Sequence, residues 1–479
     1  MAFADYDLEE KFYDEMFASD GTPREQSQKL SEALAALPRE ELGKLQEGVY
    51  RRFLHEGITF TVLGTKASEQ IIPIDCVPRL LTATEWDTIE RGLMQRLVAL
   101  NLFIKDVYNE RRCLKNKVVP LDIVMGCPQY RMEMQGVKVP YDVYVSVCGT
   151  DIVRTHEGFA VLEDNLRVPS GVSYMLACRN AMKEAFPRVY RAHGVREVAG
   201  YTEKLSRVLR SLVPSSQGAN MAILTPGYYN SAYYEHAFLA GEMGIDLVEG
   251  RDLVVRDAVL YARTTQGLRR IDILYRRIDD DFLDPVCFRH DSVLGAAGMF
   301  HAYRAGNLVL ANAPGTGVAD DKGLYAYVPE IIRYFLGEEP LLPNVETYLC
   351  REPMGLAYTL DHLDQLVVKE VGGAGGYGML VGPHATKVER QEYAKRLRAN
   401  PTDFIAQPTL PLSRTPCLVD GRFGPRHVDL RPFVLQGRDG PSVVPGAFCR
   451  VALRKGSLVV NSSQGGGCKD LWVLGDSRC

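Results

Sequence analysis

The chain has 479 residues, 46% of them hydrophobic, and a formal net charge of -4. That length exceeds what one ordinary core accommodates, so two to four globular domains or subdomains are expected. Acidic and basic residues are mixed along the chain without a lysine- or arginine-rich block, which excludes the electrostatic pattern of a protein that binds nucleic acid or a membrane surface.

The N-terminus and the cysteines predict the compartment. The opening stretch MAFADYDLEEKFYDEMF is acidic and lacks the apolar segment of a signal peptide, and no run approaches the ~20 apolar residues of a membrane span. Eleven cysteines are scattered singly, without a C-x-x-C pair or a zinc-type Cys/His spacing. We therefore expect reduced, buried thiols and a cytoplasmic location.

The first ~80 residues are expected to be helical and peripheral. An amphipathic run opens at Thr22-Pro23 and reaches Leu37, and PREELGKLQEGVYRRFLHEG predicts a second helix that ends at Gly57. Two roles stay open for these helices, a cap on the fold and a contact in a homo-oligomer. The next stretch, TATEWDTIERGLMQRLVALNLFIKDVYNERR, has apolar residues at intervals of three and four and predicts a long core helix.

The middle of the chain changes from alternating strands to a βαβ pattern. Residues 141–165 predict an antiparallel strand pair that turns near His156 to Gly158. From Met221 a strand, a helix ending at Gly244 and a further strand form a βαβ unit, and IDILYRR and NLVLANA extend its sheet. A boundary is expected near Thr316. Beyond a helical stretch, strands are predicted at LVVKEV, HVDLRPFVLQ, AFCRVALRKG and SLVVNSS.

A glycine-rich loop follows a lysine in LVVKEVGGAGGYGM, residues 366–379. The G-x-G-x-x-G spacing in this loop does not indicate a dinucleotide site or a P-loop, because a strand rather than a helix follows it. A kinase loop is also excluded, since its glycines precede the lysine. Two interpretations stay open: a hairpin that holds nucleotide phosphates through its backbone amides and lysine, and an ordinary surface hairpin.

Oxygen ligands gather in the predicted antiparallel pair. Glu163 and Asn165 lie two apart on one strand and so face the same side, and Asp151 comes from the paired strand. Such a set suits Mg²⁺, which binds through one or two carboxylates together with substrate phosphates. The alternative is a strand end with a solvated Glu163. Elsewhere Asp429, Arg431 and Arg450 lie on otherwise apolar strands, where charges usually have a partner or a function.

In combination these motifs resemble the circularly permuted ATP-grasp enzymes. The family's metal motifs appear early, as GTDIVR and VLEDN, whereas ADDKG, VVKEVGGAGGYGM, FIAQP, VDLRPF and VNSSQGGG come late, so the usual order is rotated. Other stretches resemble the type often labelled glutathionylspermidine-synthase-like, but nothing resembles an amidase half with a catalytic cysteine. The resemblance spans roughly Gly57 to the C-terminus.

The resemblance implies a mixed α+β and α/β ATP-grasp fold, circularly permuted, with a Rossmann-like pre-ATP-grasp subdomain. Five segments are expected: residues 1–80, an N-terminal helical segment; 81–215, the half of the core with the metal motif; 216–315, the pre-ATP-grasp-like subdomain; 316–410, the small lobe with the glycine-rich flap; and 411–479, the remaining core strands.

It also implies roles for particular residues. ATP would be bound through its phosphates by Lys322 and Lys369, by a flap that contains Gly372, Gly373, Gly375, Gly376 and Gly378, and through adenine by the backbone of Ala406 and Gln407. Mg²⁺ would be held by Asp151, Glu163 and Asn165. The acyl phosphate and the transferring phosphoryl group would be stabilised by Arg431, Arg450 and Asn461.

Where the acceptor substrate would bind, the sequence departs from the common ligases. Asp164 stands where they have an apolar residue, and Arg167 precedes the turn that contains Ser170. A substrate with amino and carboxylate groups would also suit Arg276 and Arg277 near three aspartates, for which the alternative is a solvated turn with local ion pairs. The expected function is an ATP- and Mg²⁺-dependent ligase for small-molecule carboxylate and amine substrates. The rivals are a nucleotide-binding regulatory or partner protein without turnover, and a phosphotransferase.

Overall fold

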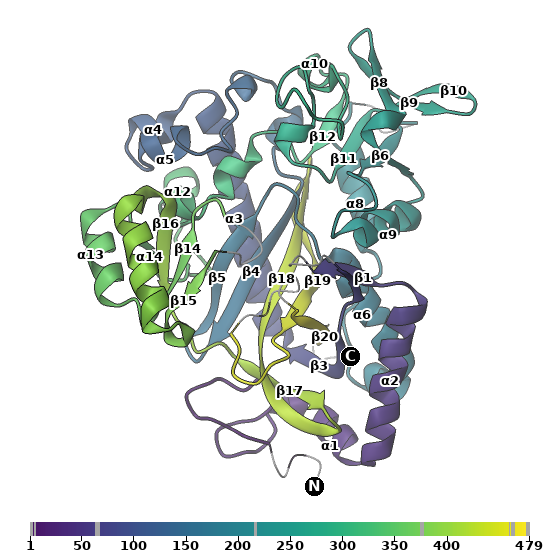
Figure 1. Ribbon diagram of the computed structural model, residues 1–479. Coiled ribbons are helices and arrows are strands. Elements are labelled where there is room, and N and C mark those ends of the chain that lie inside the picture. Colours follow the sequence, from purple (N-terminus) through teal and green to yellow (C-terminus); the bar gives the residue numbers. More distant parts are fainter. Residues whose placement is uncertain are drawn as a thin grey trace.

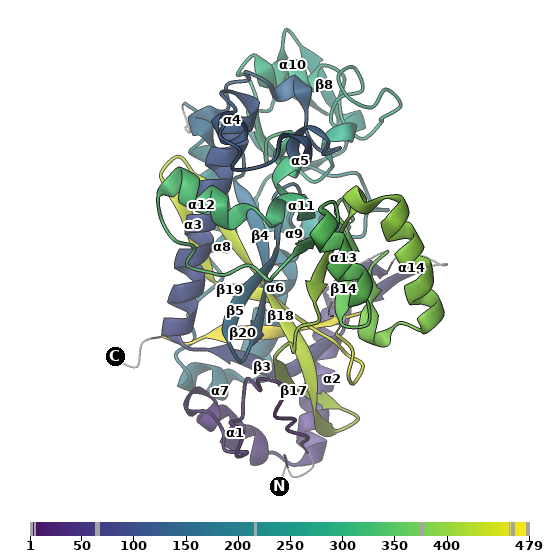
Figure 2. The same ribbon diagram turned by 90° about the vertical axis from the view of Figure 1, so that its left-hand side faces the viewer.

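The computed structural model describes residues 3, 6–62, 68–214, 218–373, 378–458, 460 and 465–475. A long, mostly antiparallel sheet runs through the molecule, with a small lobe beside it and a parallel α/β unit at one end (Figure 1). The view turned by 90° shows the small lobe projecting from the face of that sheet (Figure 2). Among the described residues, no helix has the length and apolar character needed to cross a membrane.

The central sheet is assembled from distant parts of the chain. Its strands follow the order β3-β20-β19-β18-β4-β5, β17 pairs with β18, and the β3-β20 pair is parallel while the other pairs are antiparallel. Their bounds are β3 Ile74–Leu81, β4 Val147–Thr155, β5 Gly158–Asn165, β17 Arg414–Val419, β18 Arg422–Gly437, β19 Gly440–Val451 and β20 Gly467–Val473. The predicted antiparallel pair is therefore β4 and β5, with its turn where expected.

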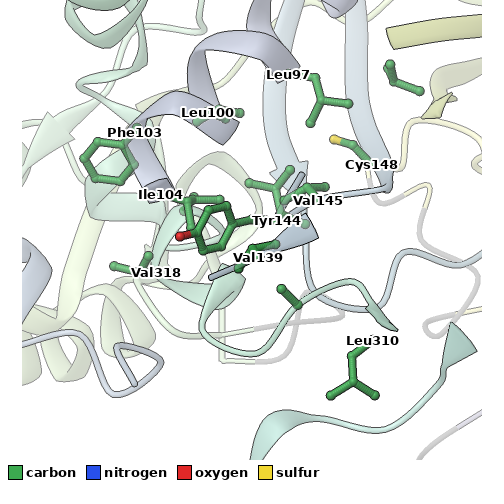
Figure 3. Packing of buried hydrophobic residues seen from close by; sticks show 14 of the residues in the cluster. Leu97, Leu100, Phe103, Ile104, Val139, Tyr144, Val145, Cys148, Leu310 and Val318 are labelled. Carbon is green, nitrogen blue, oxygen red and sulfur yellow. The ribbon is translucent and has the colours of Figure 1, made fainter. Parts of the chain in front are cut away.

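Helices cover both faces of this sheet. On one face lies α3, Ala83–Tyr108, which a Thr82/Glu85 capping box begins. Its predicted apolar stripe is buried, and Leu97, Leu100, Phe103 and Ile104 pack near Tyr144 and Val145, which precede β4 (Figure 3). On the other face lies α6, Val172–Ala185, which packs against β19 and β20. The side chains of each strand therefore divide between an α3 side and an α6 side.

The parallel α/β unit matches the predicted βαβ pattern. Its sheet has the order β12-β11-β6-β7 with parallel pairs throughout, and a smaller sheet, β10-β9-β8, projects from it (Figure 1). The bounds are β6 Met221–Leu224, α9 Tyr233–Met243, β7 Asp246–Val248, β8 Leu253–Arg256, β9 Val259–Thr264, β10 Gly267–Arg270, β11 Ile273–Arg276, α10 Met299–Arg304 and β12 Val309–Ala311.

The small lobe is a sheet with the order β13-β16-β14-β15 and two covering helices. The glycine-rich loop joins β14 to β15, which pair antiparallel as predicted. The bounds are β13 Tyr348–Leu349, α13 Pro353–Asp361, β14 Leu366–Glu370, β15 Leu380–Val381, α14 Lys387–Ala399 and β16 Phe404–Pro408. Other helices are α4 Arg112–Lys115, α5 Leu121–Met125, α7 Pro187–Ala192, α8 Tyr201–Arg210, α11 Lys322–Tyr325 and α12 Val328–Leu336.

The expectation that the first 80 residues are helical and peripheral is only partly right. The two helices exist, as α1 Gln28–Ala35 and α2 Arg39–His55, and are followed by a hairpin of β1 Thr59–Val62 and β2 Ser68–Ile71. However, β3 is a strand of the central sheet with all eight residues buried. In addition, Glu15 forms buried ion pairs with Arg79 of β3 and Arg154 of β4, so the N-terminal segment is tied to the core.

The predicted C-terminal strand is also displaced. In SLVVNSS, the described residues 457, 458 and 460 are not in a strand. Instead GCKDLWV forms β20, which is buried along its whole length between β19 and β3. Because both faces of β20 are covered, its sequence does not alternate between apolar and polar residues, and the pattern that reveals a half-exposed strand is absent.

Candidate functional site

Two adjoining cavities lie where the small lobe meets the α6 side of the central sheet. The first, which we call the apolar cavity, has a volume of about 160 Å³ and is lined by Leu162, Val367, Met379, Val381, Leu410, Leu412, Leu458 and Val460, among others. The second, the polar cavity, has a volume of about 500 Å³. Both are lined by Glu163, Lys322, Gly373 and Arg450, so these residues mark their junction.

An ionic cluster forms the sheet side of the junction. Asp429 of β18 lies opposite Arg450 of β19, and Asp151 of β4 lies opposite Glu163 of β5. The Asp151 carboxylate accepts hydrogen bonds from Arg431 Nε at 2.5 Å and Nη2 at 2.8 Å, and from Arg450 Nη2 at 2.7 Å. Burial alone would raise the pKa of Asp151, but the two guanidinium groups outweigh it and hold the pKa below its ordinary value.

Glu163 and Asn165 share the face of β5 that lines the polar cavity. Glu163 is held loosely, with Lys322 Nζ at 3.7 Å and Arg431 Nη2 at 3.9 Å. Asn165 donates its amide to the carbonyl of Gly149 at 3.0 Å, which leaves its side-chain oxygen as an acceptor. Among the described residues, no three or more His, Cys, Asp and Glu side chains are grouped so as to hold a metal ion.

Asp164 has a different environment from the one expected. Its carboxylate forms hydrogen bonds with Arg96 Nε at 2.9 and 2.8 Å and with the Thr150 hydroxyl at 3.1 Å, and it is buried. Because Arg96 lies on α3, this carboxylate is directed to the opposite side of the sheet from Glu163. It therefore fastens β5 to α3, although Asp164 is also among the residues that line the polar cavity.

The two lysines reach the junction from different elements. Lys369 of β14 donates from Nζ to Gln407 Oε1 at 2.7 Å, and burial lowers its pKa to about 8, against the opposing charge of Glu163. Lys322, at the start of α11, donates from Nζ to the carbonyl of Gly373 at 2.5 Å. The residues that sequence analysis linked to phosphate binding thus converge, although they are far apart in the chain.

The remaining nucleotide-binding candidates divide into three groups. Gln407 and Gly373 line the apolar cavity and Gly372 the polar one. Gly378 has a φ of 71° and its carbonyl accepts from the Tyr393 hydroxyl of α14 at 2.5 Å, whereas Ala406 is buried inside the sheet between β13 and β14. Gly375, Gly376 and Asn461 lie outside the described residues.

Of the four substrate candidates, the structure brings two to the polar cavity. Arg167 and Ser170 line it, with Arg167 Nε donating to Asp320 at 2.6 Å. Arg276 is fully buried, donates from Nε to the Asn312 carbonyl at 2.7 Å, and forms an ion pair with Asp280 in which Nη2 and Oδ1 are 2.7 Å apart. It lines neither cavity, and its role is to hold β11 to the segment after β12.

Arg277 also lines neither cavity but is linked to one. It donates from Nη2 to Glu235 Oε1 at 2.9 Å and from Nη1 to the Pro169 carbonyl at 2.7 Å. The other oxygen of Glu235 accepts from the backbone N–H groups of Gly171 at 2.7 Å and Ser173 at 3.1 Å, at the start of α6. Arg277 therefore positions the turn that carries Ser170.

Several lining residues of the polar cavity carried no signal in the sequence. Phe60 comes from the hairpin after α2, which belonged to the stretch expected to be peripheral, and Tyr174 and Phe448 are members of ordinary apolar patterns. Glu235 lies in a helix whose sequence, YYEHAFLAGEM, has no recognisable motif. A buried Arg277 requires a partner for its charge, but nothing in the sequence marks Glu235 as that partner.

Comparison with known proteins agrees with the fold. The family model described as "Circularly permuted ATP-grasp type 2" matches residues 78–452. An uncharacterized protein of Synechocystis is 51% identical over 97% of each chain, and one of Mycobacterium tuberculosis is 46% identical over 96% of this chain and 84% of its own. A protein of Frankia casuarinae, provisionally named a glutamate–cysteine ligase, is 41% identical over 96% of this chain but only 53% of its own.

Among solved structures, a glutathione synthetase-like effector from Globodera pallida in its apo form has a TM-score of 0.59 at 9% identity. The match covers 91% of this chain and 98% of the effector. At that identity the likeness concerns the fold alone.

Proposed function

Because the chain belongs to the circularly permuted ATP-grasp type 2 family, we propose that it is an ATP- and Mg²⁺-dependent ligase that joins a carboxylate to an amine. The observation that carries this proposal is the junction of the two cavities, where Lys322, Lys369, Arg431, Arg450 and Glu163 converge from both lobes. The provisional name of the Frankia relative also suggests a ligase.

The apolar cavity suits the adenine ring of ATP. It is bounded by aliphatic side chains from the small lobe, from β5 and from the part of the chain after β16, with the amide of Gln407 as a polar group. Phosphates extending from it toward the junction would meet Lys369 and Lys322, whose donors now bind Gln407 and the Gly373 carbonyl. These internal acceptors are neutral and can be exchanged for phosphate oxygens, whose negative charge strengthens the hydrogen bonds from the two ammonium groups.

Mg²⁺ fits the oxygen donors beside the lysines. Glu163 and the side-chain oxygen of Asn165 share one face, and Asp151 lies directly opposite Glu163. One or two carboxylates with an amide oxygen and substrate phosphates are a normal donor set for this ion, even without a cluster of three acidic residues. When bound there, the ion would neutralise phosphate charge.

Arg431 and Arg450 support the chemistry of transfer. A substrate carboxylate in the polar cavity would attack the γ-phosphorus of ATP, forming an acyl phosphate and releasing ADP. An amine would then attack the acyl carbon, forming the amide bond as phosphate leaves and the nitrogen loses a proton. Fixed guanidinium groups at this position favour the charge that develops on the transferring group, without the need for a nucleophilic side chain.

The first test is calorimetric titration of ATP with Mg²⁺ into the protein and two variants. Glu163→Ala removes an ion ligand and Lys369→Ala a phosphate partner, so each should weaken ATP binding by about tenfold or more. The matched control is Lys395→Ala, which removes an exposed lysine of α14 away from both cavities. A wild-type protein that binds no ATP, or variants that bind like the control, would refute the site.

A second measurement addresses the reaction itself. ADP release should require a carboxylate and an amine together, which can be checked with panels of amino acids, small peptides and polyamines. Release with a carboxylate alone, and a phosphorylated product, would instead identify a phosphotransferase.

A further inference from the structure

The polar cavity has two walls that the transfer chemistry does not use. One part of its lining is the junction, with Glu163, Lys322 and Arg450. The rest of the lining includes an acidic side, formed by Asp320 and Asp321 just before α11, and an aromatic side that comes from other elements. The two sides differ enough to constrain which substrate the cavity accepts.

The two aspartates of the acidic side are not equivalent. Asp320 is saturated by internal donors, because one oxygen accepts from the Leu166 N–H and the other from Arg167. Asp321 uses Oδ1 to cap α11, accepting from the N–H groups of Gly323 at 2.8 Å and Leu324 at 3.2 Å.

The second oxygen of Asp321 has a weak partner. In the part of the chain that the structure describes, the donor to Oδ2 is the thiol of Cys127 at 3.8 Å. Burial raises the pKa of Asp321, although its backbone hydrogen bonds oppose this. A half-buried carboxylate oxygen at a cavity wall, with only a thiol as donor, is suited to a cationic ligand.

The aromatic side consists of Phe60, Tyr174 and Phe448, which we call the aromatic wall. The ring centroids of Phe60 and Tyr174 are 6.3 Å apart, and those of Tyr174 and Phe448 are 5.4 Å apart. The Tyr174 hydroxyl donates to the Thr59 carbonyl at 2.9 Å, so its polar end is already satisfied. Because Tyr174 and Phe448 are themselves buried, the wall offers ring surface mainly at the half-buried Phe60, which they support, rather than hydrogen bonds.

The wall is also fixed in place. Gly171 has a φ of 119°, and a Cβ at that position would lie 2.6 Å from Phe448 Cδ1. Glycine thus permits the turn before α6 to approach the Phe448 ring closely. Phe60 comes from the β1-β2 hairpin, which gives this N-terminal hairpin a place in the cavity lining.

We propose that the polar cavity selects, as the amine substrate, an amino compound with a bulky apolar side chain, whose ammonium group binds Asp321 and whose side chain packs on the aromatic wall. This assignment rests on the proposed ligase function, since it specifies the second substrate of the same site. It is narrower than a general preference for amines, because the substrate must provide both an ammonium group for Asp321 and an apolar side chain for the aromatic wall.

The test is equilibrium binding by calorimetry to the protein saturated with ADP and Mg²⁺. Three probes differ in one feature each: phenylalaninamide has both groups, glycinamide lacks the side chain, and 3-phenylpropanamide lacks the amine. Phenylalaninamide should bind about tenfold or more tightly than either of the others, since an ion-paired ammonium and a buried ring each contribute at least that factor.

Two variants separate the walls. Asp321→Asn keeps a good helix-capping residue and should remove the preference for phenylalaninamide over 3-phenylpropanamide. Phe60→Ala should remove most of its preference over glycinamide, and Phe60→Leu should restore part of it. Both variants should bind ADP within about twofold of wild type, which a general structural defect beside Lys322 would not allow. Asp291→Asn, on an exposed loop, is the matched control.

The two proposals fail in different ways. Failure to bind ATP in a titration without any amine refutes the ligase proposal. If ATP binds but phenylalaninamide binds no tighter than both other probes, or if the variants leave the two preferences unchanged, this assignment of the polar cavity is overturned while the nucleotide site stands.

Discussion

At the scale of single residues, Lys369 is a buried lysine that lies near the junction of the two cavities. Its pKa is lowered to about 8 because burial disfavours the ammonium, with Glu163 opposing the shift. Only the charged form attracts phosphate, so raising the pH through 8 should weaken ATP binding, by about tenfold between about pH 7 and about pH 9. Calorimetry at several pH values measures this.

The matched variant for that prediction is Lys369→Arg. A guanidinium stays charged over this range, so the variant should show a flatter dependence of ATP affinity on pH. An equally steep dependence in wild type and variant would assign the titration to another group.

Residues on strands illustrate what the sequence could and could not predict. The alternation along β5 places Glu163 and Asn165 on one face, and this was predicted correctly. The same alternation directs Asp164 to the other face, toward Arg96, a consequence that sequence analysis did not draw. The structure shows Arg276 and Arg277 buried with internal partners, and a polar cluster in a sequence does not reveal whether it is exposed or buried in this way.

At the scale of elements, the start of α6 depends on one carboxylate from α9. Glu235→Gln leaves the Arg277 guanidinium buried without a counter-charge, which typically lowers the free energy of unfolding by about 3–5 kcal/mol. Urea unfolding followed by circular dichroism measures the loss. Glu203→Gln is the control, because its partner Arg207 is exposed on α8 and the pair should contribute nothing measurable. Equal midpoints for the two variants would contradict this account.

The elements that sequence analysis found share a property. The βαβ unit, the β4-β5 pair and the β14-β15 hairpin all lie between clear turn signals and show a regular period. In contrast, β3 and β20 were missed, because each is buried on both faces and has an arginine, lysine or aspartate within it. Their charges are satisfied inside the protein, for example by the pair of Asp75 and Lys469, which sequence alone does not reveal.

At the scale of the whole molecule, the central sheet joins the N-terminal segment to the far end of the chain through the parallel β3-β20 pair. A chain that starts at Ala83 lacks β3 and the Glu15 partner of Arg154, and exposes the buried edge of β20. We expect it to lose cooperative thermal unfolding, as measured by calorimetry. A folded product with the wild-type melting temperature would show that the N-terminal segment is dispensable.

The division of the chain into five segments stays a prediction.

The doubly paired Asp151 has a consequence for how ligands would bind together. Two guanidinium groups already neutralise this carboxylate. A phosphate that draws Arg431 away leaves Asp151 freer to attract a cation, and a cation on Asp151 releases Arg431 for phosphate, while Arg450 keeps Asp429 as its second partner. Each ligand thus removes the competitor of the other, so nucleotide and Mg²⁺ should bind with positive coupling, and thermodynamic linkage requires that each raises the affinity of the other by the same factor.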